Sequence, residues 1–422
     1  MSLTSQTDQI KVNAALSTPV MLASQKQTVY LRIGLTGIRP KKESIVPINV
    51  ALIIDKSASM QGEKIRGAKD AAHKAVDRLR FDDIIAVVTY NHHAETLLPA
   101  TKAQNKEMIK TLIEKLRGGG QSALFDGIEK GAKEIRQFLD RKRVNRIILI
   151  SDGFANVGPS TPEELGILGT SLGKENIVVT TIGLGLGYNE DLMTQLAEKS
   201  DGNHAFAEKS SDLADFFNHE FGDLFSVVSQ EVNVTIIGVD GVRPLRVLGR
   251  EAFIKASKVL VKLNQLYSNQ EKYVLLELEV PPIKANQDRV IAGVAVIYRN
   301  MDTDVMERLS CVLSATFTDS PQLVEKKTNA MVMTALIEQL AVEKNKRAVE
   351  LRDQGFVTEA QKVLLDNATH LAEEAAKYDS KSLEKLSDIN RDDAKNLDEK
   401  NWKKQRKSMR QQQYKLKNQQ KY

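Results

Sequence analysis

Cysteine is nearly absent from this sequence, which has only Cys311 among its 422 residues. A single cysteine excludes an internal disulfide and supplies no zinc ligand set. The lack of disulfides favours a reducing compartment, and the polar N-terminal segment lacks the apolar stretch of a signal peptide. No apolar run approaches the length of about 18 residues that a membrane-spanning helix needs. We therefore expect a cytoplasmic protein without a membrane span.

Histidine is also scarce, with six residues, and the motifs of common enzyme classes are missing. His92 and His93 are adjacent in a predicted loop, so their side chains tend to point apart, and the HExxH motif of zinc proteases does not occur. Neither a GxSxG nucleophile turn nor a GxxxxGK[ST] phosphate loop is present. Gly183, Gly185 and Gly187 follow a strand and are better explained by a tight turn than by nucleotide binding. We predict no catalytic residues and a non-enzymatic protein.

The composition that remains is that of a globular protein, with 41% hydrophobic and 27% charged residues. The length suffices for two or three domains with full hydrophobic cores. The net charge of +5 is unevenly distributed, because residues 400–422 contain nine Lys or Arg and no Asp or Glu, which leaves −4 for the rest. We therefore expect a mildly acidic folded body and a basic C-terminal tail.

Residues 46–227 alternate apolar strands with amphipathic helices. Runs that are apolar on both faces are typical of parallel strands covered by helices on each side. A short run at 94–98 follows the second strand too closely for a helical crossover, so we expect an antiparallel edge strand there. The repeated order of strand and helix predicts an α/β fold with a doubly wound, mostly parallel sheet. The expected parallel strands are residues 48–54, 84–88, 147–150 and 177–182.

Strands with an alternating pattern flank this block on both sides. Residues 29–35 alternate apolar with more polar side chains, and the same period of two returns within residues 228–320. Such alternation indicates one buried and one solvated face, as in antiparallel sandwiches. The simplest interpretation is that the α/β domain, residues 46–227, is inserted in an antiparallel β-sandwich formed by residues 1–45 and 228–320. The alternative is a separate N-terminal hairpin packed on the α/β domain.

The C-terminal part has a helical pattern. Residues 324–353 and 357–377 are rich in Ala, Leu, Glu and Lys and are separated by a break at Gly355. This pattern predicts an antiparallel helical hairpin. We expect a further charged helix from Ser380 into the basic tail. We assign residues 321–399 to the hairpin and residues 400–422 to the basic tail.

Five oxygen-bearing side chains occur where a strand or a glycine segment leads into a helix. Asp55, Ser57 and Ser59 follow the first apolar strand, Ser122 follows three glycines, and Asp152 follows a later strand. Ligands of open α/β sheets bind beyond the carboxyl ends of the strands, so we expect these residues at one rim. Their oxygens suit a hard divalent cation, Mg²⁺ first, with Mn²⁺ or Ca²⁺ as alternatives. Any one segment alone is better explained as a helix or strand cap, but three together favour a metal.

The same residues resemble the metal-ion-dependent adhesion site (MIDAS) of von Willebrand factor type A (VWA) domains. The family pattern is Asp-x-Ser-x-Ser, a distant Thr after a glycine pair, and a distant Asp usually followed by Gly. The sequence reads DKSASM, GGGQSALFDG and LISDG, and the segments TIGLG and EDLMTQLAEKSDG also agree. The resemblance covers residues 46–227 and departs from the pattern at Ala58, where Gly is common, and at Ser122, where Thr is usual. Bacterial VWA proteins related to inter-alpha-trypsin inhibitor heavy chains and calcium-activated chloride channel regulators have a similar architecture.

The resemblance also implies a role for each of the five residues. Ser57, Ser59 and Ser122 would bind the cation through their hydroxyls, and Asp55 and Asp152 would act directly or through water. Neutral hydroxyl ligands leave the charge of the cation poorly compensated, so the ion would take up a further, anionic ligand. The implied partner is a protein that supplies an Asp or Glu carboxylate to the metal.

A second interpretation places the function in the basic tail. Lys403, Lys404, Arg406, Lys407 and Arg410 could contact the phosphates of nucleic acid or of an anionic membrane. The tail contains few aromatic residues and no RNA-binding signature. A solvated helix end or a flexible tail explains the charges more simply, and binding through the tail remains the alternative prediction.

Overall fold

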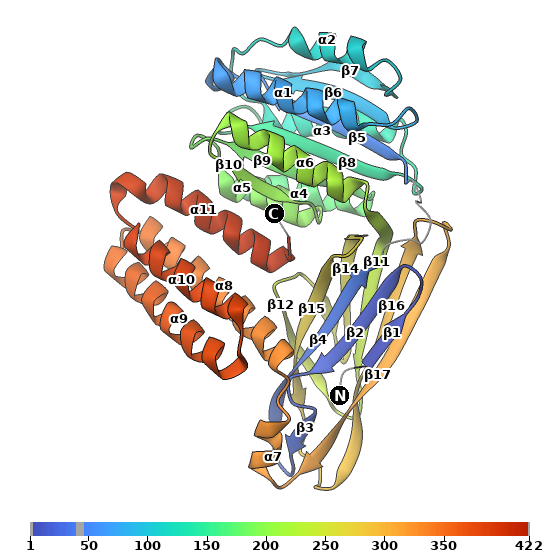
Figure 1. Cartoon of the computed structure of the whole chain (residues 1–422), viewed down its shortest axis with the longest axis vertical. Helices are drawn as coiled ribbons and strands as arrows, with labels where there is room; N and C mark the ends of the chain where they lie inside the picture. The colour runs from blue at the N-terminus through green and yellow to red at the C-terminus, as the bar shows by residue number, and fades with distance from the viewer. Residues whose placement is uncertain (1–2, 39–45, 421–422) are drawn as a thin grey trace. The chain divides into compact units, whose positions relative to one another are not determined.

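A computed structural model describes residues 3–38 and 46–420 of the chain (Figure 1). These residues form two compact units. Residues 46–227 make up the first, called the α/β unit below. Residues 3–38 and 228–419 together make up the second, called the sheet-and-helix unit. Within the described ranges, none of the helices combines the length and the apolar character that crossing a membrane requires.

The α/β unit is built on a sheet with the strand order β10-β9-β8-β5-β6-β7. Strand β7 runs antiparallel to β6, and the other neighbouring pairs are parallel. The predicted doubly wound sheet and its antiparallel edge strand are therefore confirmed. The strand β10 was not predicted, because four residues are too short to show a periodic pattern. The strands are β5 (Ile48–Asp55), β6 (Ile84–Tyr90), β7 (Ala94–Lys102), β8 (Val144–Ser151), β9 (Ile177–Leu184) and β10 (His204–Ala207).

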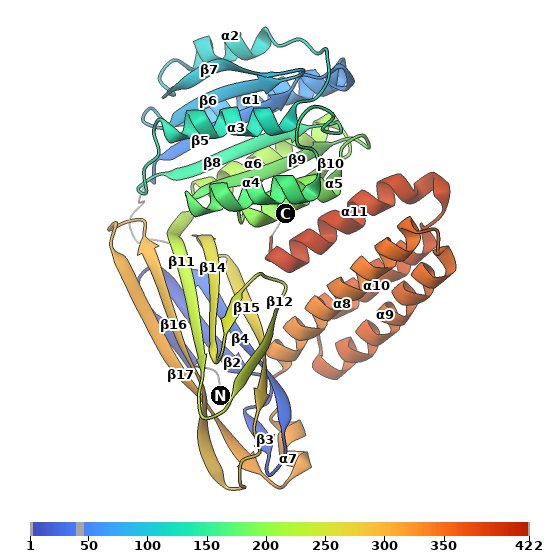
Figure 2. The same ribbon diagram turned by 180° about the vertical axis from the view of Figure 1, so that it is seen from behind.

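Helices cover both faces of this sheet, as Figures 1 and 2 show from opposite sides. Helices α1 and α6 lie on one face, and α3, α4 and α5 lie on the other. All eight residues of β5 are buried, as expected for a strand enclosed by two helical layers. The helices are α1 (Glu63–Arg78), α2 (Lys106–Glu114), α3 (Leu124–Arg136), α4 (Pro162–Lys174), α5 (Glu190–Lys199) and α6 (Leu213–Leu224), with short 3₁₀ turns η1 (Ala58–Met60) and η2 (Ser210–Asp212).

The sheet-and-helix unit contains two further sheets that contribute to one hydrophobic core. Their strand orders are β1-β2-β4-β15-β12 and β13-β14-β11-β16-β17-β3. One pair differs from the expected antiparallel arrangement, because β3 runs parallel to β17. The strands are β1 (Leu3–Gln6), β2 (Ile10–Leu16), β3 (Val20–Leu22), β4 (Gln27–Gly37), β11 (Val227–Gly238), β12 (Arg243–Leu248), β13 (Phe253–Lys255), β14 (Lys258–Tyr267), β15 (Glu271–Val280), β16 (Gln287–Asn300) and β17 (Met306–Thr318).

The N-terminal strands belong to the same sheets as the strands that follow the α/β unit. Strand β4 pairs with β15 along ten consecutive positions, from Gln27 opposite Val280 to Thr36 opposite Glu271. The α/β unit is therefore inserted between β4 and β11 of one continuous β-structure. A separate N-terminal hairpin is incompatible with this pairing.

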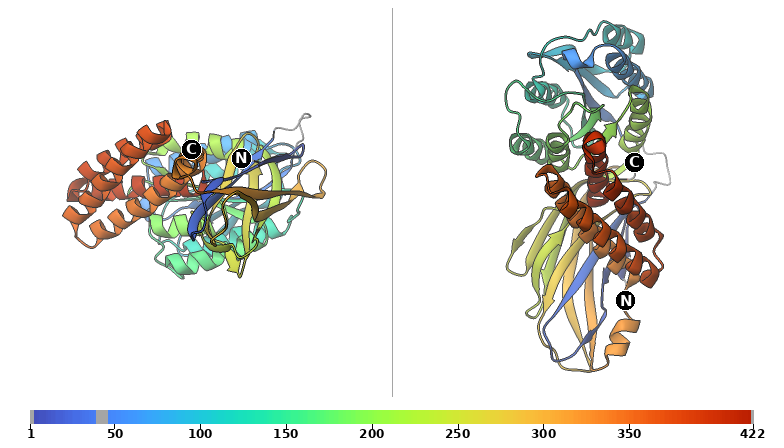
Figure 3. Two further views of the ribbon diagram at one scale, coloured as in Figure 1. Left: turned by 90° about the horizontal axis from the view of Figure 1, so that it is seen from below. Right: turned by 90° about the vertical axis from the view of Figure 1, so that its left-hand side faces the viewer.

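The C-terminal helices extend further than the predicted hairpin. Helices α8 and α9 correspond to the hairpin, and α10 and α11 add to them (Figure 3, orange to red). The segment expected to be a basic tail is mostly helix α11, whose Met409 is 1% exposed and belongs to a hydrophobic cluster with residues of α8, α9 and α10. The segment has few apolar residues among many charged ones, so its sequence showed no clear apolar face. The helices are α7 (Pro321–Lys326), α8 (Ala330–Asp353), α9 (Val357–Tyr378), α10 (Lys381–Lys395) and α11 (Glu399–Asn418).

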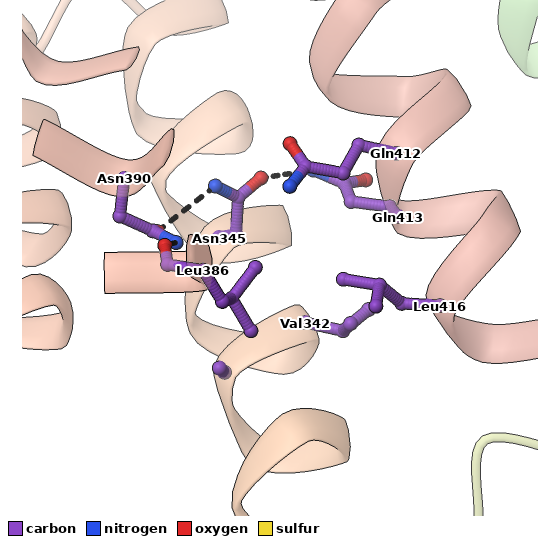
Figure 4. Close-up of a pocket in the computed structure, with 8 residues that line it drawn as sticks. Val342, Asn345, Leu386, Asn390, Gln412, Gln413 and Leu416 are labelled. Atoms are coloured by element: carbon purple, nitrogen blue, oxygen red, sulfur yellow. Dashed lines mark hydrogen bonds between the residues drawn. The ribbon is translucent and has the colours of Figure 1, made fainter. Parts of the chain in front are cut away.

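Buried amide side chains connect these helices. Asn345 of α8 donates to Asn390 of α10 at 3.1 Å and accepts from Gln413 of α11 at 2.7 Å (Figure 4). Asn367 of α9 also donates to Asn390, at 3.1 Å. The adjacent cavity has a volume of about 10 Å³, which is the lower limit for one water molecule. The polar centre of the bundle is therefore too small to bind an organic ligand.

Candidate metal centre

The carboxyl ends of two adjacent parallel strands hold the predicted carboxylates. Asp55 is the last residue of β5, and Asp152 directly follows β8. The two strands pair in register, with Ile54 opposite Ile150, so both chains leave the sheet at the same rim. A parallel register therefore brings together two aspartates that are 97 positions apart in the sequence.

The three predicted hydroxyls join the two carboxylates in one hydrogen-bonded cluster. The Ser57 and Ser59 hydroxyl oxygens are 3.1 Å apart, and Ser59 donates to Oδ1 of Asp152 at 2.8 Å. Ser122 donates to Oδ2 of Asp55 at 3.4 Å, and the backbone N–H of Ser57 donates to Oδ1 of Asp55 at 2.8 Å. The five residues singled out from the sequence thus form a single network. Four of them are buried, and Ser59 is exposed, so the cluster opens to solvent beside Ser59.

Oxygens of this cluster surround a point next to Gly153. A β-carbon built on Gly153 would lie 3.4 Å from the Ser59 hydroxyl oxygen, 3.9 Å from Oδ2 of Asp55 and 4.0 Å from the Ser57 hydroxyl oxygen. Three oxygen atoms from separate side chains therefore face a common space that the glycine leaves open. This geometry fits a small, hard cation, which oxygen ligands of this kind bind.

Glycines and backbone hydrogen bonds hold the loops that carry these side chains. The N–H of Ala58 donates to the carbonyl of Gly120 at 3.0 Å, and the N–H of Gly119 donates to the carbonyl of Lys56 at 2.7 Å. Gly120 has a φ of +98°, which residues with a side chain rarely adopt. These hydrogen bonds join the turn that bears Ser57 and Ser59 to the glycine segment that precedes Ser122.

The pattern of residues and the fold both correspond to a known domain family. The family model of the von Willebrand factor type A domain matches residues 49–219. Residues 49–219 form a von Willebrand factor type A domain. The match includes all five residues of the oxygen cluster and the six strands of the α/β sheet, apart from the first residue of β5.

Several relatives with known sequences align with part of this chain. The chain is 26% identical over 295 residues to the Synechocystis protein sll0103, covering 65% of this chain and 66% of the relative. It is 26% identical over 213 residues to YfbK of Escherichia coli, covering 50% of this chain and 37% of the relative. It is 25% identical over 179 residues to the rat inter-alpha-trypsin inhibitor heavy chain H3, covering 40% of this chain and 20% of the relative. The chain thus spans less than two thirds of the length of each of these relatives.

Two solved structures share the fold over nearly the whole chain. A VWA protein from Catenulispora acidiphila has a TM-score of 0.75 at 15% identity, covering 94% of this chain and 91% of its own. The ArnB paralog VWA2 from Sulfolobus acidocaldarius has a TM-score of 0.65 at 18% identity, covering 96% of this chain and 98% of its own. The similarity therefore extends beyond the VWA domain to the other elements of the chain.

The environment of Asp55 disfavours an unpaired negative charge. Burial raises the pKa of Asp55, and hydrogen bonds from Ser57 and Ser151 partly offset this effect. The pKa of Tyr90, at the end of β6, is also raised well above its usual value by burial and by the nearby Asp55. A buried carboxylate whose charged form is disfavoured gains from a nearby cation, which supports a cation-binding role for the cluster.

Three further residues at this site were not predicted from the sequence. The Ser151 hydroxyl donates to Oδ2 of Asp55 at 2.7 Å, and the side chain of Asn156 accepts the N–H of Ser122 at 2.9 Å. The ammonium group of Lys64 forms an ion pair with Oδ2 of Asp152. None of the three lies in the family pattern that guided the sequence analysis. Ser151 immediately precedes Asp152 at the end of a strand, which is the one signal that could have identified it.

A metal at this site would need the serine hydroxyls as ligands, because the cluster holds only two carboxylates. In the part of the chain that the structure describes, no group of three or more His, Cys, Asp and Glu side chains is arranged to hold a metal. The VWA cluster offers two carboxylates, and its remaining donors are serines. A soft or borderline metal that prefers sulfur and nitrogen ligands would find a poor set here.

The basic residues of the alternative prediction do not form a separate exposed patch. Arg406 forms an ion pair with Asp353 of α8 at 2.9 Å, and Arg410 donates to Gln413 within α11 at 3.0 Å. Lys407 is 2% exposed, whereas Lys403 and Lys404 face solvent. Neither this arrangement nor the comparisons support binding of nucleic acid or a membrane through this segment.

Proposed function

We propose that the VWA domain binds an acidic side chain of a partner protein through a divalent cation held by the oxygen cluster. Ser57, Ser59 and Ser122 would supply hydroxyl ligands, and Asp55 and Asp152 would orient them or bind the ion directly or through water. Mg²⁺ is the first choice, with Mn²⁺ or Ca²⁺ as alternatives. The observation that carries the proposal is the convergence of three oxygens on the space beside Gly153.

The charge of the cluster supports a partner that supplies a carboxylate. Two aspartates balance a divalent cation only in part once Asp152 is shared with Lys64. An additional anionic ligand would complete the neutralisation, and the exposed Ser59 leaves one side of the cluster accessible to it. Metal and partner would then strengthen one another, since coupling between two binding events is reciprocal.

The proposal describes a binding module and not an enzyme. A metal that catalyses hydrolysis commonly activates a bound water molecule beside a suitable general base. A cluster rich in neutral hydroxyls is suited to holding a ligand, and the hydrogen bonds described above join serines with aspartates. The acidic partner itself would be the species that the domain recognises.

Replacement of Asp55 by Asn tests this proposal. The variant keeps the size of the side chain and removes its charge. Asp83→Asn is the matched control, because Asp83 is also buried in the VWA domain and accepts the N–H of Ile48 at 2.8 Å, at the opposite end of β5. In calorimetric titration with Mn²⁺, wild type and D83N should bind with a dissociation constant of about 10⁻⁴–10⁻³ M. D55N should bind at least about tenfold more weakly.

The second part of the test concerns the partner. Immobilised wild-type protein should capture a partner from native lysate in Mg²⁺ and release it in EDTA, whereas D55N should capture none. Equal Mn²⁺ heats for D55N and wild type would contradict the assignment of the metal site. Capture that persists in EDTA would contradict the role of the metal in binding.

A further inference from the structure

Lys64 places a positive charge inside the oxygen cluster. It is the second residue of α1, and its ammonium group pairs with Oδ2 of Asp152. The Asp152 side chain is fully buried, while Lys64 is 34% exposed. Since Oδ1 of Asp152 accepts the Ser59 hydroxyl, the lysine engages the oxygen that this hydrogen bond leaves available.

The lysine side chain lies beside a neighbouring loop. A β-carbon built on Gly185 would lie 3.5 Å from Cε and 3.7 Å from Nζ of Lys64. Gly185 has a φ of +73°, so the loop after β9 takes a conformation that favours glycine. Lys64 therefore passes along the backbone of this loop to reach Asp152.

Lys64 changes the charge balance of the site. Asp55 and Asp152 carry two negative charges, and the ammonium group neutralises one of them. With a divalent cation bound, the cluster of Asp55, Asp152 and Lys64 would have a net charge of +1 instead of zero. The extra positive charge repels the cation and attracts an anion. Lys64 thus acts in opposite directions on the two ligands of the proposed function.

We propose that Lys64 is a tethered cation that weakens metal binding and strengthens binding of the anionic ligand, an inference that rests on the proposed metal-dependent function. The site then holds its metal firmly only when an acidic group is also bound. Because Lys64 lowers the affinity for the metal alone and raises that for the anion, occupancy by the metal at low concentration would rely on the bound carboxylate. It is a specificity-determining residue for this site.

Lys56 provides a matched control. It also lies next to the cluster, directly after Asp55, but its ammonium group pairs with Glu95 at the start of β7. Lys56→Gln removes a neighbouring positive charge without removing the partner of Asp152. Lys64→Arg keeps the charge beside Asp152, whereas Lys64→Gln removes it and keeps much of the side chain.

The first measurement is the dissociation constant of Mn²⁺ alone, determined by calorimetry on the full chain. We expect K64Q to bind Mn²⁺ about tenfold more tightly than wild type, with K64R and K56Q close to wild type. Thermal unfolding gives a second readout. In EDTA, K64Q should unfold at a lower temperature than wild type because Asp152 loses its cation, and Mn²⁺ should raise the midpoint more for K64Q than for wild type.

The second measurement uses acetate as the anionic probe. Acetate is titrated onto the Mn²⁺-loaded protein, and binding is followed by the paramagnetic broadening of its methyl proton signal. We expect acetate to bind the K64Q protein about threefold more weakly than wild type, and K64R similarly to wild type.

The outcomes separate this inference from the function on which it rests. Absence of Mn²⁺ binding by wild type, K64Q and K64R would overturn the proposed function. Equal Mn²⁺ dissociation constants for wild type and K64Q would overturn the role of Lys64 and leave the function standing. Weaker Mn²⁺ binding by K64Q, with K64R like wild type, would also overturn it, because Lys64 would then order the site and not compete with the metal.

Discussion

Gly153 follows Asp152 directly, and the position of its missing side chain borders the oxygen cluster. A β-carbon at this residue would lie 3.4 to 4.0 Å from the nearest oxygens, which is ordinary van der Waals contact. An alanine would therefore be tolerated by the surrounding protein, but its methyl group would occupy the space that the oxygens face. The fold thus tolerates a side chain at this residue, whereas the proposed metal site requires glycine.

We predict that Gly153→Ala weakens Mn²⁺ binding by about tenfold or more and changes the thermal midpoint by less than about 2 °C. Calorimetry and thermal unfolding in EDTA measure the two effects. Gly158→Ala is a control of the opposite kind, since Gly158 lies in the same loop with a φ of +75° and open space around it. It should lower stability slightly and leave the affinity unchanged, and the reverse pattern would contradict the assigned space.

Asp393 in α10 is a second buried carboxylate, and its environment makes stability depend on pH. Burial raises its pKa from 3.8 to about 6, although it accepts hydrogen bonds from Asn345 and Gln405. Because the folded state binds this proton more tightly than the unfolded chain, the stability that this group contributes is greatest below pH 4 and falls as the pH rises through 6.

We predict that the Asp393 contribution to the unfolding free energy is about 2 kcal/mol larger at pH 4.5 than at pH 7. Asp393→Asn removes the titrating group, so the difference in stability between wild type and variant should change by that amount over this range. Urea unfolding followed by the fluorescence of Trp402, the single tryptophan of the chain and a residue of α11, measures it. A constant difference between the two proteins would contradict the raised pKa.

At the scale of the elements, the long apolar runs of the sequence predicted the buried parallel strands. Strands β5 and β8 are buried on both faces and were located within a few residues of their observed bounds. The five oxygen-bearing side chains that were predicted as ligands lie in one hydrogen-bonded cluster, and four of them stand at or just after the ends of these two strands. Lys64 was not found, because its pairing depends on how α1 and the loop after β9 approach Asp152, and no sequence spacing records that approach.

The packing of helix α11 was not predicted, for a related reason. Its sequence is dominated by Lys, Arg and Gln, so its average polarity indicated a solvated helix end or a flexible tail. The buried Met409, Gln413 and Tyr414 lie on the side of the helix that packs on the bundle. A helix with a few apolar contacts and several polar ones is stabilised mainly by tertiary packing, which average composition does not report.

Met409→Ala distinguishes a packed helix from a tail. Met409 is 1% exposed and contacts the cluster that includes Val349, Leu364 and Leu397. We predict a loss of about 2–4 kcal/mol in the unfolding free energy followed by Trp402 fluorescence. Lys403→Ala, on the exposed side of the same helix, should change it by less than about 0.5 kcal/mol. A negligible effect of M409A would restore the interpretation of a tail.

At the scale of the whole molecule, the insertion of the VWA domain is made possible by adjacent chain ends in the sheet-and-helix unit. Gly37 ends β4, and a β-carbon built on it would lie 2.9 Å from Cγ2 of Val228, the second residue of β11. The strands that leave for the VWA domain and return from it are therefore neighbours. Insertions at such closely spaced ends leave the host core intact.

We predict that the two units fold independently and that the metal site belongs to one of them alone. Residues 46–227 expressed separately should bind Mn²⁺ with the dissociation constant of the full chain. Residues 1–38 joined to 228–422 by a short glycine linker should fold cooperatively and bind none, as judged by circular dichroism and calorimetry. Asp55, Ser57, Ser59, Ser122 and Asp152 all lie within the excised segment, so a weaker metal affinity of that segment would show that the host unit stabilises the loops of the site. Equal affinity would mean that the sheet-and-helix unit contributes nothing to metal binding.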